Sequence, residues 1–259
     1  MKHLMLTCVC LFIILILANT SNAKIDPESV MAMWLFDSDE KTIRDSSPNG
    51  NDGNPEGNPE WVKEGKFGGA MRFDAVDDII KIPMTIDYDE ITVMCWVIEE
   101  GSPVRPRIVS NDHTDVSNKG FQLMYNTAGS GSWFDIGTGA HTAATFAYVA
   151  EIGEWYHYTG TYDGSAVRAF IDGEQMVETG GASGEILDSA IDVHIGSSTY
   201  AISDALKGVL DEVAIFNKAL GEEDIQSIMA NGLEKATGLL AVSPASKLAT
   251  CWSKIKQLK

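Results

Sequence analysis

Short apolar runs, separated by glycine, asparagine, aspartate and proline, set the rhythm of most of this 259-residue chain. The runs are rich in β-branched and aromatic residues, a composition that is typical of β-strands. Nine of them predict strands over residues 30–36, 70–73, 79–82, 91–98, 121–125, 155–162, 167–171, 193–195 and 206–216.

The best-defined hairpin is expected in the second half of the chain. Successive side chains over residues 155–162 alternate between two faces, as the period of a strand requires. Residues 167–171 then run into Asp172 and Gly173. An Asp-Gly pair favours the type I′ turn, because both central residues of that turn need a positive φ. We therefore expect a returning strand over residues 174–178.

One segment beyond the N-terminal region has the periodicity of a helix. Residues 219–230 place Leu220, Ile225 and Ile228 on one side, and acids crowd the first turn, where the helix dipole favours them. Gly232 marks the expected end of this helix.

The segments between the strands read as surface loops, above all residues 45–58 and 129–132, which are dense in turn-forming residues. Many short strands with one late helix predict an all-β fold of two antiparallel sheets packed as a sandwich.

Both ends of the chain differ from this central domain, which we place at residues 24–238. Residues 1–23 combine a basic start, an apolar run over 4–18 and small residues before Lys24, which predicts a cleaved signal peptide and a secreted, periplasmic or cell-surface protein. The alternative is an uncleaved anchor, but the run is short for a span of roughly 20 residues. No membrane span is expected after cleavage. Residues 239–259 form a basic tail.

The charge of the chain narrows the classes of partner. The formal net charge is −18, and loss of Lys2 with the leader leaves 18 bases against 37 acids, or −19. Such a surface repels phosphate backbones and attracts cations, so nucleic acid is not an expected partner. Two cysteines remain after cleavage, Cys95 and Cys251, and whether they pair stays open.

Five segments, in this order, carry a resemblance to a known family. They are Trp-Leu-Phe-Asp (34–37); Asp-Ser-Ser-Pro-Asn-Gly-Asn-Asp-Gly (45–53); Gly-Lys-Phe-Gly-Gly-Ala-Met-Arg-Phe-Asp (65–74) with Val-Asp-Asp (76–78); Trp-Tyr-His-Tyr (155–158) through Tyr-Asp-Gly (162–164) to Phe-Ile-Asp-Gly (170–173); and Gly-Val-Leu-Asp-Glu-Val-Ala-Ile-Phe-Asn-Lys-Ala-Leu (208–220). Over residues 29–232 the chain resembles the laminin-G-like, concanavalin A-like jelly-roll domains of bacterial exported proteins. The resemblance implies a jelly-roll sandwich and says less about function.

The resemblance also implies a structural calcium ion, which takes six to eight oxygen ligands. The candidate ligands are Asp37, Asn51, Asp77, Asp78 and Asp211, with Asp52 as a further oxygen donor. Asp211 is the strongest of them, because it interrupts an apolar strand and needs a partner there. Pairing of the first strand with the last is expected to bring Asp37 near Asp211. The alternative is that these residues only stabilise turns.

Within this family, a non-catalytic binding module is the expected function. Aromatic rings in or near loops, Trp133, Tyr125 and Tyr200, are candidates for stacking on a sugar, which makes a glycan the expected ligand. A cell-surface protein, bound in an adhesive or structural role, is the alternative partner, and the sequence does not separate the two.

Enzymes of the same fold are the third possibility. Laminarinase-type glycosidases carry a Glu-x-Asp-x-x-Glu strand motif, whose carboxylates perform the hydrolysis. The nearest match here, residues 222–227, has Ser227 in place of the last glutamate and lies on the expected helix. No histidine stands at zinc-ligand spacing from another histidine or cysteine, so a zinc enzyme is not expected either.

Overall fold

The computed structural model describes residues 25–102, 105–111, 118–125, 133–197 and 204–239. The proposed leader and nearly all of the basic tail lie outside these residues, as do Tyr200 and Cys251. Among the residues described, no helix is long and apolar enough to span a bilayer.

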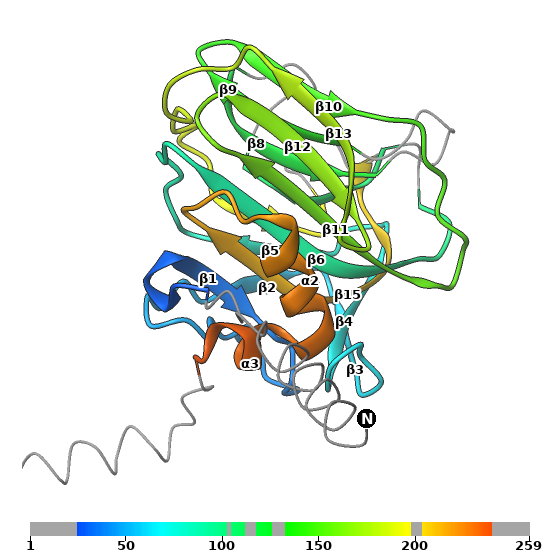
Figure 1. The fold of residues 1–259 in the computed structure, drawn as a ribbon. Helices are drawn as coiled ribbons and strands as arrows, with labels where there is room; N and C mark the ends of the chain where they lie inside the picture. The colour runs from blue at the N-terminus through cyan, green and yellow to red at the C-terminus, as the bar shows by residue number, and fades with distance from the viewer. Residues whose placement is uncertain (1–24, 103–104, 112–117, 126–132, 198–203, 240–259) are drawn as a thin grey trace, which may run out of the picture.

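Two antiparallel sheets make up the molecule (Figure 1). The first sheet contains β1 (Val30–Trp34), β3 (Glu60–Val62), β4 (Ala70–Asp74), β6 (Ile91–Glu99), β11 (Trp155–Tyr162), β12 (Ala166–Ile171), β13 (Glu174–Gly180) and β15 (Lys207–Phe216). The second contains β2 (Asn54–Glu56), β5 (Ile79–Ile82), β7 (Arg107–Ser110), β8 (Lys119–Met124), β9 (Trp133–Thr138), β10 (His141–Thr145) and β14 (Val193–Ile195). The strand order is β13-β12-β11-β6-β15-β4-β3 in the first sheet, with β1 also on β15, and β10-β9-β8-β7-β14-β5-β2 in the second. The all-β sandwich expected from the sequence is thereby confirmed.

The main hydrophobic core fills the space between the sheets. Alternation along β11 sends Tyr158 and Tyr162 into this core, where Phe121 and Phe134 of the second sheet meet them. Gly160 lies between the two tyrosines, and a Cβ there would fall 2.0 Å from the ring of Phe134. The glycine therefore permits the close approach of the two sheets.

A second apolar cluster covers the outer face of the first sheet. Helix α2 (Glu222–Asn231) lays Ile225 and Ile228 on Met94 and Phe170 of that face. Figure 1 shows α2 in front of β6 and β15, followed at once by α3 (Leu233–Thr237). The helix expected over residues 219–230 is α2, and Gly232, with a φ of 78°, ends it as expected. The second short helix, α3, was not predicted from the sequence. A short 3-10 helix, η1 (Pro27–Ser29), precedes β1.

The hairpin predicted at Asp172 and Gly173 is confirmed. Both residues have positive φ, 49° and 77°, and Ile171 pairs with Glu174 across the turn. The longer loop prediction was wrong in part, because β2 lies inside residues 45–58. Sequence reasoning also missed β3, β7, β9 and β10, four strands whose short or polar sequences lack an apolar run.

Candidate functional site

The last strand holds two consecutive buried acids, the acid pair Asp211 and Glu212. Asp211 is 0% exposed and Glu212 4%, and the pairing of β15 with β6 shifts register at this point. Glu212 has a φ of 53°, the left-handed conformation that β-bulges often use. The bulge lets two neighbouring residues both point away from the main core.

Backbone amides are the partners of this acid pair. Asp211 accepts hydrogen bonds from Phe67 N (2.8 Å) and from the Glu212 amide (2.7 Å), and Glu212 accepts one from Leu233 N at the start of α3. Burial raises the pKa of Asp211 to about 8 and that of Glu212 to about 7. Both acids therefore fasten loops to the sheet, Asp211 the segment 65–69 and Glu212 the second helix.

Asp37 contributes to the same attachment. Strand β1 pairs with β15, as expected, and Asp37 follows β1 and accepts from Gly69 N at 3.1 Å. Burial raises its pKa as well. Asp37 and Asp211 thus reach the same loop from two strands, and each accepts a hydrogen bond from a backbone amide of that loop.

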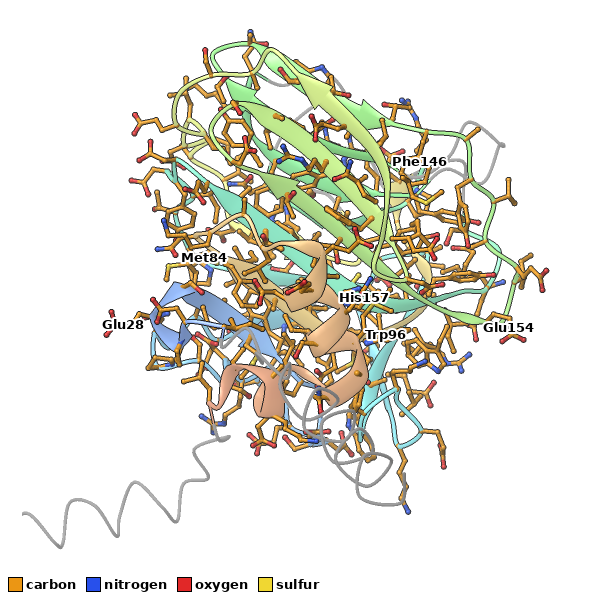
Figure 2. The ribbon with its side chains drawn as sticks, viewed as in Figure 1. Glu28, Met84, Trp96, Phe146, Glu154 and His157 are labelled. Atoms are coloured by element: carbon orange, nitrogen blue, oxygen red, sulfur yellow. The ribbon has the colours of Figure 1, made fainter. Side chains whose placement is uncertain are left out.

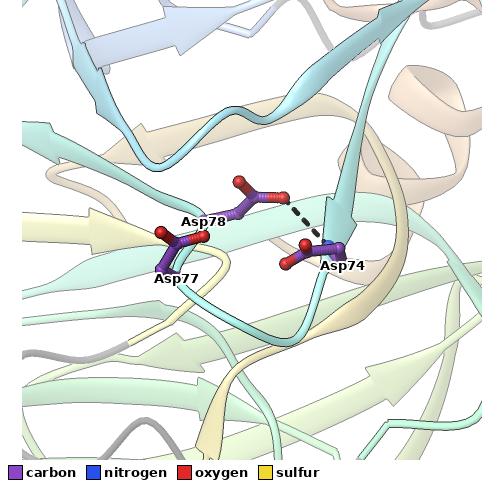
Figure 3. Close-up of side chains that lie close together, drawn as sticks. All are labelled: Asp74, Asp77 and Asp78. Carbon is purple, nitrogen blue, oxygen red and sulfur yellow. Dashed lines mark hydrogen bonds between the residues drawn. The ribbon is translucent and has the colours of Figure 1, made fainter.

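A different set of carboxylates comes together where β4 turns into β5. This acidic trio is Asp74, Asp77 and Asp78 (Figure 3), and one oxygen from each lies within 4.8 Å of the other two. Within the described part of the chain, no other group of three acids, histidines or cysteines is this close. Asp78 is 4% exposed, whereas Asp74 and Asp77 are exposed.

The trio is held by amides yet keeps free oxygens. Asp78 accepts from Asn58 N at 2.7 Å and from Asp74 N at 3.0 Å, and Asp74 accepts from Val76 N at 2.7 Å. The carboxylate of Asp77 accepts no hydrogen bond from a described residue. Burial, followed by the charge of Asp74, raises the pKa of Asp78. Sequence analysis found two members of the trio and missed Asp74, which ends a strand; the Asp-x-x-Asp-Asp spacing was the available signal.

Asn51, the remaining metal candidate, lies in a third part of the structure, where it links the loop after β1 to that strand. Its side chain donates to Met31 O at 2.8 Å, and its carbonyl accepts from the indole of Trp34 at 3.0 Å. Nearby, Asp52 accepts from the Asp45 amide at 2.9 Å. The predicted metal residues therefore divide among three local structures, and only Asp77 and Asp78 belong to a carboxylate group of metal-binding size.

The aromatic residues predicted to bind a sugar differ in how far the structure describes them and in their exposure to solvent. Tyr125 is only 4% exposed and packs on Tyr158 of the core with ring centroids 6.0 Å apart, so it does not present a ring face to solvent. Trp133 begins β9 opposite Met124, and its side chain lies outside the described atoms, as does the whole of Tyr200.

A group of aromatic side chains lies on the connection from β10 to β11 and at the start of β11, packed against the edge of the main core. This aromatic edge consists of Phe146, Tyr148 and Tyr156, all half-buried. Tyr148 contacts Phe146 at 6.3 Å and meets Tyr156 edge-on at 5.8 Å between ring centroids. Figure 2 shows Phe146 beside this connection, away from α2.

Two exposed apolar side chains extend the edge, Val149 at 60% and Ile152 at 71% exposure. Burial, and then Tyr156, raise the pKa of Tyr148, so its hydroxyl stays protonated and can donate. The Tyr156 hydroxyl accepts from Glu151 N at 3.2 Å. The edge combines rings for stacking with hydroxyls for hydrogen bonding.

The aromatic edge and the acidic trio share one end of the first sheet. Asp74 pairs with Lys207 at the start of β15, Glu99 at the end of β6 pairs with Gly208, and Ile98 pairs with Trp155 at the start of β11. Strands β4, β15, β6 and β11 are consecutive in the sheet. The candidate metal site and the candidate ligand surface are therefore at the same end of the molecule, three strands apart.

Comparison with protein families identifies the fold group. The model of the concanavalin A-like lectin/glucanases superfamily matches residues 74–226, more than half of the chain. The chain belongs to this superfamily. The family resemblance inferred from sequence motifs is thereby confirmed. No curated protein sequence matches the chain.

Solved structures of similar fold include both binding domains and enzymes. Domain 4 of AbnA, a GH43 extracellular arabinanase from Geobacillus stearothermophilus, in complex with arabinotriose, has a TM-score of 0.66 and 19% identity, covering 78% of this chain and 98% of that domain. The binding domain of Paraclostridial Mosquitocidal Protein 1 has a TM-score of 0.61 and 13% identity, covering 78% of this chain and 52% of the other. A Trypanosoma rangeli sialidase has a TM-score of 0.59 and 14% identity, with 80% and 33% coverage. At these identities the likeness shows the fold alone.

Residues 222–227, the nearest match to a glycosidase motif, form the first turns of α2 on the outer face of the first sheet. Glu222 bonds Gln226 within the helix at 3.1 Å, and Ser227 stands where the second catalytic glutamate is required. A retaining or inverting mechanism needs two carboxyl groups on opposite sides of the scissile bond. A run of acids along one helical turn does not supply that arrangement.

Proposed function

We propose that this protein is an exported, non-catalytic module that binds glycans through the aromatic edge, with a calcium ion held by the acidic trio. The aromatic edge is the observation that carries the proposal: three half-buried rings, two of them phenols with a hydroxyl, at the surface of a sandwich domain. Stacking on such rings buries the apolar face of a sugar, while the hydroxyls bond its edge. The similar fold of an arabinanase domain solved with arabinotriose supports this choice of ligand.

Calcium fits the acidic trio by the chemistry of its donors. The ion takes hard oxygen ligands at 2.3–2.6 Å, so ligands on opposite sides of it lie up to about 5 Å apart. The 4.8 Å limit on the trio is compatible with that span. Asp77, with no hydrogen bond to a described residue, and the partly used carboxylate of Asp74 can turn toward a cation at little cost. A divalent ion here offsets local repulsion in a chain of net charge −18.

A protein partner is the second candidate. Two exposed apolar residues beside the rings, Val149 and Ile152, favour a protein partner. Exposed aliphatic side chains are typical of protein-binding surfaces, whereas a glycan is bound mainly through rings and polar groups. In either case the ligand meets the module outside the cytoplasm, provided that the leader is cleaved near Lys24.

Retention on immobilised polysaccharides, arabinan and β-glucan among them, tests the glycan proposal with and without calcium. We expect Tyr148→Ala to weaken binding by roughly tenfold, since an aromatic contact contributes about 0.5–1.5 kcal/mol beyond the area that it buries. The matched control is Tyr88→Ala, which removes a half-buried tyrosine just before β6, at the far end of that strand. If instead Ile152→Ser abolishes binding of a cell-surface protein and no polysaccharide is retained, the protein partner is correct.

A further inference from the structure

A groove outside the aromatic edge lies on the outer face of the first sheet, between β12 and the beginning of α2. Its volume is about 220 Å³, smaller than the pockets that hold drug-sized ligands. Strands β11, β12 and β13 supply its floor, and the segment from Ala219 to Glu222 supplies its rim. Space of this size suits one small ring-shaped molecule rather than a chain.

The floor of the groove presents polar groups that have no use within the domain. Thr161 lines the groove, and its hydroxyl has no hydrogen bond to another described residue that would occupy it. The amide of Gln175, also in the lining, makes none either. The Thr161 hydroxyl and the Gln175 amide are therefore both available to hydrogen-bond a molecule that enters the groove.

An ion pair fixes the polar wall beside Thr161. Arg168 is the cross-strand neighbour of Thr161 and donates to Asp163 at 2.6 Å and to Glu178 at 2.6 Å. These bonds hold the guanidinium in place, so the wall needs no rearrangement when a ligand arrives. Phe170, two residues farther along β12, adds an apolar part to the lining.

The rim is equally well fixed. The Thr92 hydroxyl accepts from Leu220 N at 2.9 Å and donates to Lys218 O at 2.6 Å. Gly221 caps α2 without a side-chain hydrogen bond, and the first helical bond runs from Ile225 N to Gly221 O. The amide of Glu222, ahead of that bond, has no intrahelical acceptor and is free to donate to a ligand oxygen at the rim.

We propose that this groove binds a single neutral sugar residue, as a second subsite distinct from the aromatic edge. The proposal rests on the proposed glycan-binding function and extends it. A sugar hydroxyl both donates and accepts, which matches the Thr161 hydroxyl, the Gln175 side-chain amide and the backbone amide of Glu222. The charges exclude acidic sugars, because Asp163, Glu178 and Glu222 outnumber Arg168 at the groove.

The test is a titration of the 15N-labelled protein followed by NMR. The probes are glucose, galactose and arabinose, with glucuronate as the acidic counterpart. A neutral sugar should shift the amide resonances of Gly221, Glu222 and Gln175 with a Kd on the order of millimolar, and glucuronate should not. Thr161→Val keeps the volume and should weaken binding roughly threefold to tenfold, since one hydrogen bond is lost. Thr161→Ser keeps the hydroxyl and should retain it, and Thr145→Val, on the exposed end of β10, is the control.

The outcomes separate the subsite from the function on which it rests. Shifts confined to Tyr148 and Tyr156, or binding that Thr161→Val leaves unchanged, overturn the groove proposal while the glycan module stands. If no monosaccharide shifts any groove amide but arabinan or glucan is retained through Tyr148, the groove proposal is again wrong. Failure of every sugar and polysaccharide to bind removes both.

Discussion

The acid pair on β15 and the acidic trio after β4 lie on neighbouring strands, and the same kind of side chain has different partners in the two places. Asp211 and Glu212 are buried, and backbone amides of other segments occupy their oxygens. The trio is mostly exposed and leaves the Asp77 carboxylate without a hydrogen bond to a described residue. A buried acid is thus accounted for by the amides that it binds, whereas clustered exposed acids have oxygens to spare for a cation.

Removal of the Asp211 carboxylate is the strongest test of the difference between the acid pair and the acidic trio. Asp211→Ala leaves the buried amides of Phe67 and Glu212 without acceptors and releases the segment 65–69 from β15. We expect a loss of about 3–4 kcal/mol in the free energy of unfolding, or roughly 10 °C in Tm. Calorimetry should give the same loss in EDTA and in excess calcium. A loss that appears only in calcium would mean that Asp211 is a metal ligand after all.

Calcium should act through the trio instead. Calcium at 100 times its Kd stabilises the fold by about 2.7 kcal/mol, or roughly 5–10 °C in Tm for a domain of this size. Asp77→Asn should abolish that gain and leave the Tm in EDTA unchanged, because the Asp77 carboxylate bonds no described residue.

The matched control for the calcium experiment is Asp39→Asn, a similarly exposed aspartate outside the trio. Melting curves of the parent chain that superimpose with EDTA and with calcium would remove the metal proposal. Loss of the calcium effect in Asp39→Asn as well would point to diffuse charge screening rather than a site.

Much of this fold could be predicted because apolar runs mark many of its strands and turn-forming residues mark where those strands end. The Asp172–Gly173 hairpin is the best example, since only a few dipeptides adopt two positive φ values at low cost. Strands such as β2 and β10 carry polar residues and exist through pairing with neighbours distant in sequence, a property that local pattern does not record.

The candidate site was harder to predict for the same reason. Asp211 was recognised as a carboxylate in need of a partner, but its partner, the Phe67 amide, is 144 residues away. Phe146 and Tyr148 lie on a connection whose course depends on both sheets, so their half-exposed position could not be read from their neighbours in sequence. The local sequence shows that a polar residue requires a hydrogen-bonding partner, but the tertiary structure determines which group lies close enough to be that partner.

The pH dependence of stability provides a finer test of the acid pair. The folded-state pKa values of about 8 for Asp211 and about 7 for Glu212 lie above the ordinary values near 4. Folding therefore favours the protonated acids, so their contribution to stability is fully present below about pH 4 and is lost as the pH rises through 7 and 8.

Thermal melts in EDTA, which keeps the trio free of metal, should show the Tm falling from pH 5.5 to pH 8.5. Glu212→Gln, which cannot ionise and keeps an oxygen for Leu233 N, should make the fall shallower between pH 5.5 and pH 7, whereas Glu223→Gln on the exposed face of α2 should not. A Tm that rises over this range would show that the pair is stabilised as anions, and that the amide donors outweigh the cost of burying the two charges.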